Sequence, residues 1–140
     1  MSSGVYNRGK LLLATRGWLA LDLRLALVTS SYTPDDVHNV VSELSGELSG
    51  GGYARATMTQ TAPTEDDAND RATCDASDVT FPSLALAAGT PRYAIVYHEG
   101  AGTDATRELV CWIDLGTTGT APEGTDYVVQ GDASGVARLT

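Results

Sequence analysis

Basic residues are scarce in this chain. Nine Lys and Arg residues stand against 18 Asp and Glu residues, which gives a net charge of -9, and Lys10 is the only lysine. A chain this acidic lacks the basic stripe that releases counterions from phosphate, so direct nucleic-acid binding is not expected. The same charge disfavours binding to anionic membrane surfaces.

Long apolar runs are also missing. The best candidate, residues 19–28, is interrupted by Asp22 and Arg24 and has about half the length that a membrane span requires. The apolar stretch at residues 11–14 is too short for the core of a signal peptide, and Arg16 interrupts its continuation. We therefore expect a protein that stays in the cytoplasm where it is made.

Cysteine is rare as well. Cys74 and Cys111 are the only two, and neither belongs to a CxxC or CxxH motif, which excludes a secreted disulfide scaffold. A chain of 140 residues can bury roughly two thirds of its unfolded surface without disulfides or metals. We expect residues 1–140 to form a single domain in which both cysteines are small buried thiols.

Catalytic motifs are absent from the sequence. It contains no GxSxG elbow, no Walker or dinucleotide-binding glycine motif and no HExxH, so we expect no enzyme, no catalytic residues and no cofactor. His38 and His98 have no further zinc ligands at useful spacing. The acidic segment 65–78 could offer oxygen ligands to calcium, but its spacing is not that of an EF-hand, which favours a solvated loop over a metal site.

Alternating leucines are the clearest positive signal. Leucine occupies every second position from Leu19 to Leu27, and a period of two places these side chains on one face of a strand that covers a core. Leucine favours helices intrinsically, so here the pattern outweighs the propensity.

The N-terminal segment 1–16 can be a short helix or a docking arm. Tyr6, Leu11, Leu12 and Leu13 have no place in a period-two strand, and Gly17 suits a helix stop. A helix would cap one open end of the domain, whereas an arm would use these four side chains to contact another protein chain.

A second short helix is expected after the leucine strand. Thr33 can cap it, Pro34 suits its first position, and apolar residues follow at helical spacing from Val37 to Leu44. The segments beyond Tyr53 are interpreted as short strands and turns, with a polar loop at 63–70, a small-residue connection at 82–90 and a hairpin around 131–135.

The strands define the expected fold class. Seven or eight short strands separated by regular turns predict a mainly β protein, a β-sandwich of jelly-roll or Ig-like type, with one or two short helices in the N-terminal third. The aromatic residues sit on or beside these strands, where packing is their usual role. A carbohydrate-binding module would instead present them as exposed platforms.

Several local strings, in this order and spacing, resemble a group of small virion proteins encoded among tailed-bacteriophage structural genes. The strings are YNRGK (6–10), LDLRLALV (21–28), SSYTPD (30–35), ELSG (47–50), GYAR (52–55), DDANDRA (66–72), ASDVTF (76–81), YAIVY (93–97) and IDL (113–115).

The resemblance implies a structural role and no catalytic residues. It suggests a head decoration or minor capsid protein with a β-sandwich fold, a homo-oligomer in the particle that contacts the major capsid protein or other virion proteins. Such a protein is made in the host cytoplasm and ends in the virion. Two alternatives stay open: a tail or tail-tip component, and a carbohydrate-binding module for adhesion. Contacts are expected around Tyr6 and Leu11 to Leu13 and at the loops 61–71 and 116–125.

The first testable prediction concerns the two cysteines. Alkylation of the denatured protein without reductant should add two adducts to its intact mass, because a cytosolic domain with a sufficient core needs no disulfide. No adduct without reductant and two adducts with it would contradict this.

Overall fold

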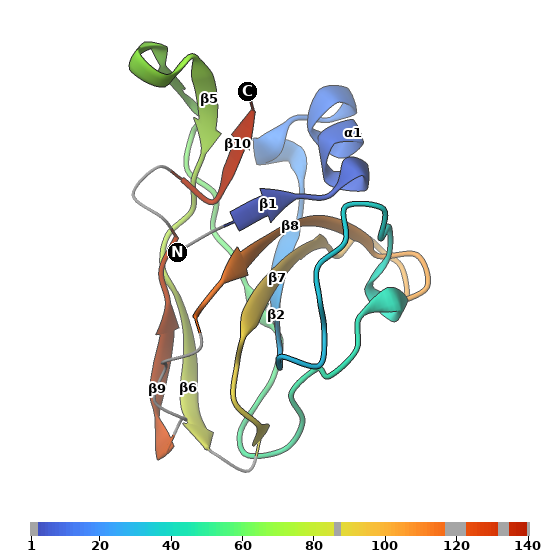
Figure 1. Ribbon diagram of the computed structural model, residues 1–140, viewed down its shortest axis with the longest axis vertical. Coiled ribbons are helices and arrows are strands. Elements are labelled where there is room, and N and C mark those ends of the chain that lie inside the picture. Colours follow the sequence, from blue (N-terminus) through green and yellow to red (C-terminus); the bar gives the residue numbers. More distant parts are fainter. Residues whose placement is uncertain (1–2, 86–87, 117–122, 132–134, 140) are drawn as a thin grey trace.

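The chain folds into a mainly β, sandwich-like structure in which two small sheets pack against a larger one (Figure 1). The computed structural model describes residues 3–85, 88–116, 123–131 and 135–139. The strands are β1 (Ser3–Val5), β2 (Leu23–Val28), β3 (Ala56–Thr57), β4 (Thr64–Asp66), β5 (Arg71–Cys74), β6 (Val79–Ala85), β7 (Tyr93–His98), β8 (Glu108–Asp114), β9 (Glu123–Val129) and β10 (Ala137–Leu139). The helical elements are α1 (Asn7–Thr15) and the short 3-10 helices η1 (Trp18–Ala20), η2 (Val41–Glu43) and η3 (Asp67–Asn69).

The larger sheet is antiparallel and is covered on both faces. Its strand order is β1-β8-β7-β2-β3, and β2 pairs with β7 along its whole length. Leu23, Leu25 and Leu27 point to one face and are at most 1% exposed, as the alternation predicts. Ala26 and Val28 point to the other face and are also fully buried. Strand β2 therefore separates two cores.

The leucine core lies between the large sheet, the two small sheets and α1. Its buried members are Leu12, Leu13, Trp18, Leu21, Leu23, Leu25, Leu27, Leu48, Met58, Cys74, Val79, Phe81, Leu84, Ala88, Ala94, Val96, Val110, Cys111, Ile113, Val129, Val136 and Ala137. Each fully buried leucine contributes roughly 1.5–3 kcal/mol of transfer free energy. This cluster is the main hydrophobic contribution to stability.

The leucine strand is shorter than its pattern suggests. Leu19 lies in η1 and is 60% exposed, and regular pairing begins only at Leu23. Trp18 fills the core in its place, with its side chain 3% exposed and its indole N–H donating to the carbonyl of Asp75 at 3.0 Å. The gain from burying the larger aromatic surface outweighs continuation of the strand.

The tyrosine core covers the opposite face of the large sheet. Its buried members are Tyr6, Ala26, Val28, Tyr32, Val41, Ile95, Tyr97 and Leu109. The hydroxyls of Tyr6 and Tyr32 lie 2.9 Å apart, and the Tyr32 hydroxyl is 2.9 Å from Nδ1 of half-buried His38. Burial raises the pKa of the Tyr6 hydroxyl above its ordinary value. The chain of bonds leads the buried hydroxyls toward the surface and satisfies their polar atoms.

A bulge in β8 receives the N-terminal helix. Tyr97 pairs with Leu109 but its neighbour Val96 pairs with Cys111, so Val110 is the extra residue. The Val110 carbonyl accepts the Tyr6 N–H at 3.1 Å, and a Cβ on Gly9 would collide with that carbonyl. The bulge puts Leu109 and Cys111 in different cores. A strict period of two would place both side chains on one face, and the bulge breaks that period.

The helix predicted at the N-terminus is confirmed, and the one predicted after Pro34 is wrong. Between Thr33 and Ser45 only η2 is helical. The Glu43 carboxylate accepts the N–H groups of Asn39 and Val40, at 2.6 and 2.8 Å, and Val40 bridges to Glu108 of β8. Pairing with the sheet edge outweighs the helical spacing of these residues.

Three loop predictions also need correction. The polar loop expected at 63–70 is a hairpin, in which Thr64 pairs with Thr73 and Asp66 with Arg71. The connection expected at 82–90 is in part strand, because β6 continues to Ala85. The hairpin expected around 131–135 does not form, since β9 pairs with β6 and β10 with β5. Residues 132–134 lie outside the described residues.

The leucine core provides a matched test of the register. We expect Leu25→Ala to lower the free energy of unfolding by about 2–5 kcal/mol, because it leaves a cavity in the core. Leu19→Ala, at the exposed end of the same alternation, should change it by less than about 0.5 kcal/mol. Equal effects in urea-unfolding curves would show that the register is wrong.

Candidate functional site

The small sheet β10-β5-β4 has one buried face and one polar face. Cys74 points to the leucine core and is 2% exposed. Arg71, Thr73 and Asp75 alternate with it and line the opposite side. An antiparallel sheet commonly buries one face and leaves the other to solvent, so this polarity follows from the period of two.

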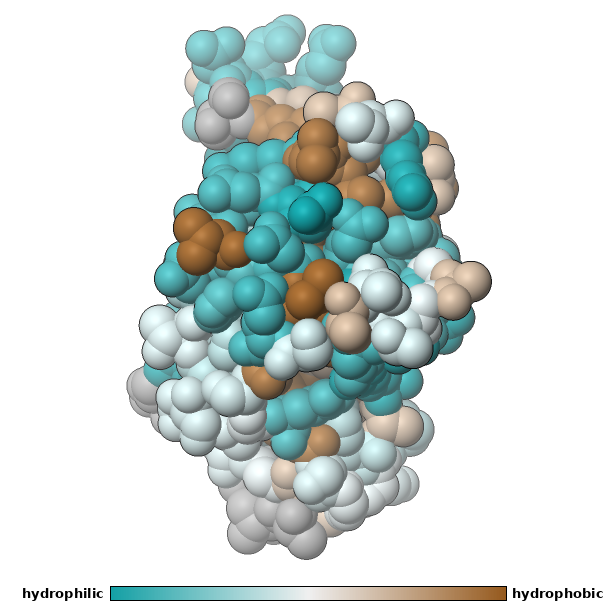
Figure 2. Space-filling view, turned by 90° about the vertical axis from the view of Figure 1, so that its right-hand side faces the viewer, coloured by the Kyte–Doolittle hydropathy of each residue, from teal (hydrophilic) through white to brown (hydrophobic). Residues whose placement is uncertain are grey.

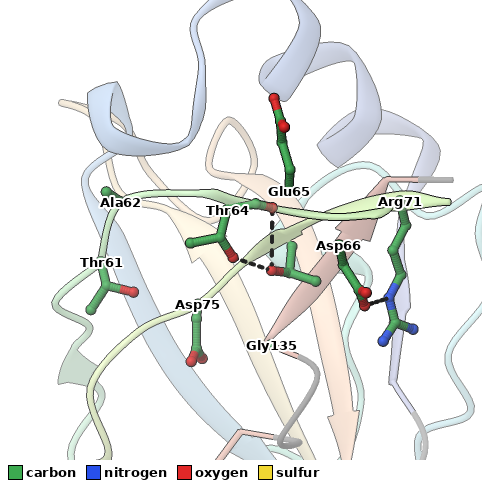
Figure 3. Close-up of a pocket in the computed structure, with 9 residues that line it drawn as sticks. Thr61, Ala62, Thr64, Glu65, Asp66, Arg71, Asp75 and Gly135 are labelled. Carbon is green, nitrogen blue, oxygen red and sulfur yellow. Dashed lines mark hydrogen bonds and ion pairs between the residues drawn. The ribbon is translucent and has the colours of Figure 1, made fainter. Parts of the chain in front are cut away.

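The polar face forms a groove of about 440 Å³ (Figure 3). Its volume is within the usual range of ligand pockets, ~300–1,000 Å³, but such pockets are normally apolar and this one is polar. The groove is lined by Thr61, Ala62, Thr64, Glu65, Asp66, Arg71, Thr73, Asp75 and Gly135.

One end of the groove is held by an ion pair. Nε of Arg71 donates to Asp66 at 2.8 Å, and the Asn69 amide donates to both oxygens of the same carboxylate at 3.0 and 2.9 Å. Hydrogen bonds from Asn69 and then from Arg71 lower the pKa of Asp66. Within the described part of the chain, the two terminal guanidinium nitrogens of Arg71 make no hydrogen bond. They are donors available at this end.

The middle of the groove is a pair of hydroxyls, and its other end is an acceptor. The hydroxyls of Thr64 and Thr73 lie 2.8 Å apart. Asp75 uses one carboxylate oxygen to accept the Ala76 N–H at 2.9 Å. Its backbone carbonyl accepts the Trp18 indole N–H at 3.0 Å and the Thr61 N–H at 2.9 Å. This end is therefore tied to the core, while the second carboxylate oxygen has no hydrogen-bond partner among the described residues.

The groove therefore offers hydrogen bonds of both kinds in a fixed order. Donors lie at the Arg71 end, hydroxyls at the centre and a carboxylate at the Asp75 end, and Figure 3 shows Glu65 pointing away from the others. Among the described residues, no group of three or more His, Cys, Asp or Glu side chains could hold a metal ion. The arrangement is suited to binding a polar ligand.

A chain of alternating charges lies beside the tyrosine core, where the Arg55 guanidinium covers the Tyr97 ring at 5.4 Å from its centroid. Arg55 binds Glu47 through two bonds of 2.7 Å and Asp104 through bonds of 2.7 and 3.0 Å. Arg107 continues the chain from Asp104, at 2.9 Å, to Glu99. These bonds tie the segment after β2 to the turn between β7 and β8. Their geometry is that of a structural clasp.

Most of the residues predicted to contact another chain are buried within this chain. Tyr6, Leu12 and Leu13 are at most 9% exposed, and of the four candidates Leu11 is exposed, at 52%. Figure 2 shows the side of the molecule that carries α1, where hydrophobic residues form separate small patches among hydrophilic ones. For Tyr6, Leu12 and Leu13 the docking hypothesis is therefore replaced by the capping helix, because burial in this fold already uses their surface.

The other sequence candidates are dispersed. His98 accepts the Asp22 N–H through Nδ1 at 3.1 Å, far in sequence from His38. Cys74 and Cys111 are free and buried, and burial raises the pKa of both thiols. Of the two loops proposed as contacts, 61–71 forms the β4–β5 hairpin, and residues 117–122 of the other lie outside the described residues. No described helix is long and apolar enough to cross a membrane.

Sequence reasoning missed the groove because it grouped the acidic residues only by charge. The alternation of Arg71, Thr73 and Asp75 against Ala72 and Cys74 is a strand signal with one polar face. The threonines of the groove carry no charge and gave no other signal. The clasp at Arg55 joins segments that are distant in sequence, and no local pattern indicates it.

Comparison with known proteins returns no relative. No protein-family model matches the chain, no curated protein matches it, and no solved structure matches its fold.

The clasp predicts a pH dependence of stability. Hydrogen bonds from Arg55 and then Arg107 lower the pKa of Asp104 from its ordinary 3.8 to about 2. Its contribution is therefore present above about pH 4 and is lost as the pH falls toward 2. The Asp104 side chain is 44% exposed, so screening by water limits this contribution to about 1 kcal/mol or less. Urea-unfolding curves of Asp104→Asn and the unaltered protein should differ at neutral pH and converge in acid; a constant difference would contradict the prediction.

Proposed function

We propose that this chain is a structural protein of a tailed-phage virion, a capsid decoration or minor capsid protein. The proposal rests on the resemblance of nine ordered strings to such proteins. A β-sandwich is what that resemblance implies, and the chain has a mainly β, sandwich-like fold. The partners in this proposal are the major capsid protein and further copies of the chain itself.

The projecting β4–β5 hairpin is the structural feature that adds support to the proposal. It extends away from the body of the molecule (Figure 1), and its tip carries the exposed side chains of Glu65, Asp67 and Asp70. Asp70 adopts a left-handed backbone with φ of 53°, a conformation in which aspartate and asparagine are enriched among residues other than glycine. The bonds of Asp66 to Asn69 and Arg71 fix the turn. A rigid element of this kind can reach a neighbouring subunit.

A decoration protein would act by linkage. Whatever binds the assembled shell more tightly than its separate subunits stabilises the shell, and the effect grows with the concentration of the bound protein. The strongly acidic tip fits a partner surface that carries Arg or Lys, because complementary charges speed and orient association.

A tail or tail-tip component is the second candidate in the same class. The same hairpin would serve there, with a tail protein as the partner. Labelled protein imaged on virions by electron microscopy separates the two sites, because label on the head favours decoration and label on the tail favours the alternative.

A charge-reversal experiment tests the role of the hairpin. We expect Glu65→Lys with Asp67→Lys to leave the domain folded, because both side chains are exposed, and to abolish its co-sedimentation with particles that lack the protein. The matched control is Asp22→Lys with Asp36→Lys, which reverses two exposed acidic side chains elsewhere on the molecule and changes the net charge equally.

Three outcomes of this experiment decide between the alternatives. Loss of co-sedimentation for the hairpin variant alone supports binding through this element. Normal binding of both double variants would contradict a contact through the hairpin, and failure of the unaltered protein to bind heads or tails would contradict the virion role itself.

A further inference from the structure

We propose that the groove on the polar face of β10-β5-β4 binds a neutral carbohydrate through hydrogen bonds. This inference concerns the groove itself and does not depend on the virion role. It rests on the order of donors and acceptors along the groove, on the fixed position of its two ends and on its local charge.

The polar groups match what a sugar presents. Each sugar hydroxyl can both donate and accept a hydrogen bond. The terminal nitrogens of Arg71 donate, the second carboxylate oxygen of Asp75 accepts, and the hydroxyls of Thr61, Thr64 and Thr73 do both. A ligand with hydroxyls along its length can therefore form bonds at both ends and at the centre.

The two ends of the groove are held in place before any ligand arrives. Arg71 is fixed by Asp66, which also accepts two hydrogen bonds from Asn69. The Asp75 backbone is fixed by the buried indole of Trp18. Groups fixed in this way lose little conformational entropy when a ligand binds.

Local charge selects against anionic ligands. The positive charge of Arg71 is balanced by Asp66, and Asp75 leaves the groove with an excess negative charge. Phosphate or sulfate groups would be repelled, whereas a neutral sugar keeps all its bonds. The chain as a whole, with a net charge of -9, adds to that repulsion.

The mode of binding differs from stacking on aromatic platforms. None of the nine described residues that line the groove is aromatic, while Trp18 and Tyr97 are at most 3% exposed. Affinity would therefore depend on hydrogen bonds, and the removal of one well-placed group should weaken binding strongly.

The test uses saturation-transfer NMR with five free disaccharides: maltose, lactose, sucrose, mannobiose and diacetylchitobiose. EDTA is present so that no metal contributes. At least one disaccharide should show saturation transfer. Asp75→Asn, which keeps an oxygen for the Ala76 N–H, and Thr61→Val should each weaken its binding about tenfold, the factor expected for one hydrogen bond to a charged or fixed group.

Asp67→Asn is the matched control. It removes one carboxylate from the same hairpin, but Asp67 does not line the groove, so binding should be unchanged. Thermal unfolding of each variant confirms that it is folded. Absence of transfer to all five disaccharides, or binding that Asp75→Asn and Thr61→Val leave unaltered, would overturn the proposal.

Discussion

Burial of β2 on both faces is the constraint on which the rest of the structure depends. Leucines 23, 25 and 27 need a second layer on one side, and β6, β9, β5, β10 and α1 together provide it. Ala26 and Val28 need a cover on the other side, which comes from the loop after β2 together with Tyr6. A slip of β2 by one residue would move its leucines into the tyrosine core and would bury Arg24 in the leucine core. Its register therefore also fixes the positions of its neighbours.

Polar side chains that can bind a ligand therefore lie on elements that bury only one face. The β4–β5 hairpin is such an element, because Cys74 anchors it in the leucine core while Arg71 and Thr73 remain accessible. The Trp18 indole links the two regions directly through the carbonyl of Asp75. A groove with walls attached to a packed core keeps its geometry, and this rigidity is what recognition by several separate hydrogen bonds requires.

The sequence predicts the fold correctly in segments whose structure is decided by a local pattern and not by contacts with distant residues. The leucine alternation, β7 and the N-terminal helix ending near Gly17 follow from period and turn chemistry. The segment after Pro34 could not, because Glu43 bonds the backbone of Asn39 and a distant strand pairs with Val40. The bulge at Val110 and the separate partners of β9 and β10 are likewise products of long-range packing. In the candidate site, the sequence shows that acidic residues are present. It does not show that Asp66 forms an ion pair with Arg71 while Asp75 keeps a carboxylate oxygen available as an acceptor.

The pairing of β1 with β8 has a consequence for how the chain folds as it is synthesised. Val5 lies opposite Cys111, and Leu25 lies opposite Val96. The N-terminal strands therefore cannot pair until β7 and β8 have been synthesised. Until then, the leucine strand and the apolar face of α1 have no partners. Distant pairings of this kind slow folding and lengthen the time during which apolar segments are exposed. The abundance of acidic residues, with 18 in the chain, gives the unfinished polypeptide a net repulsion that opposes its association with other unfinished copies.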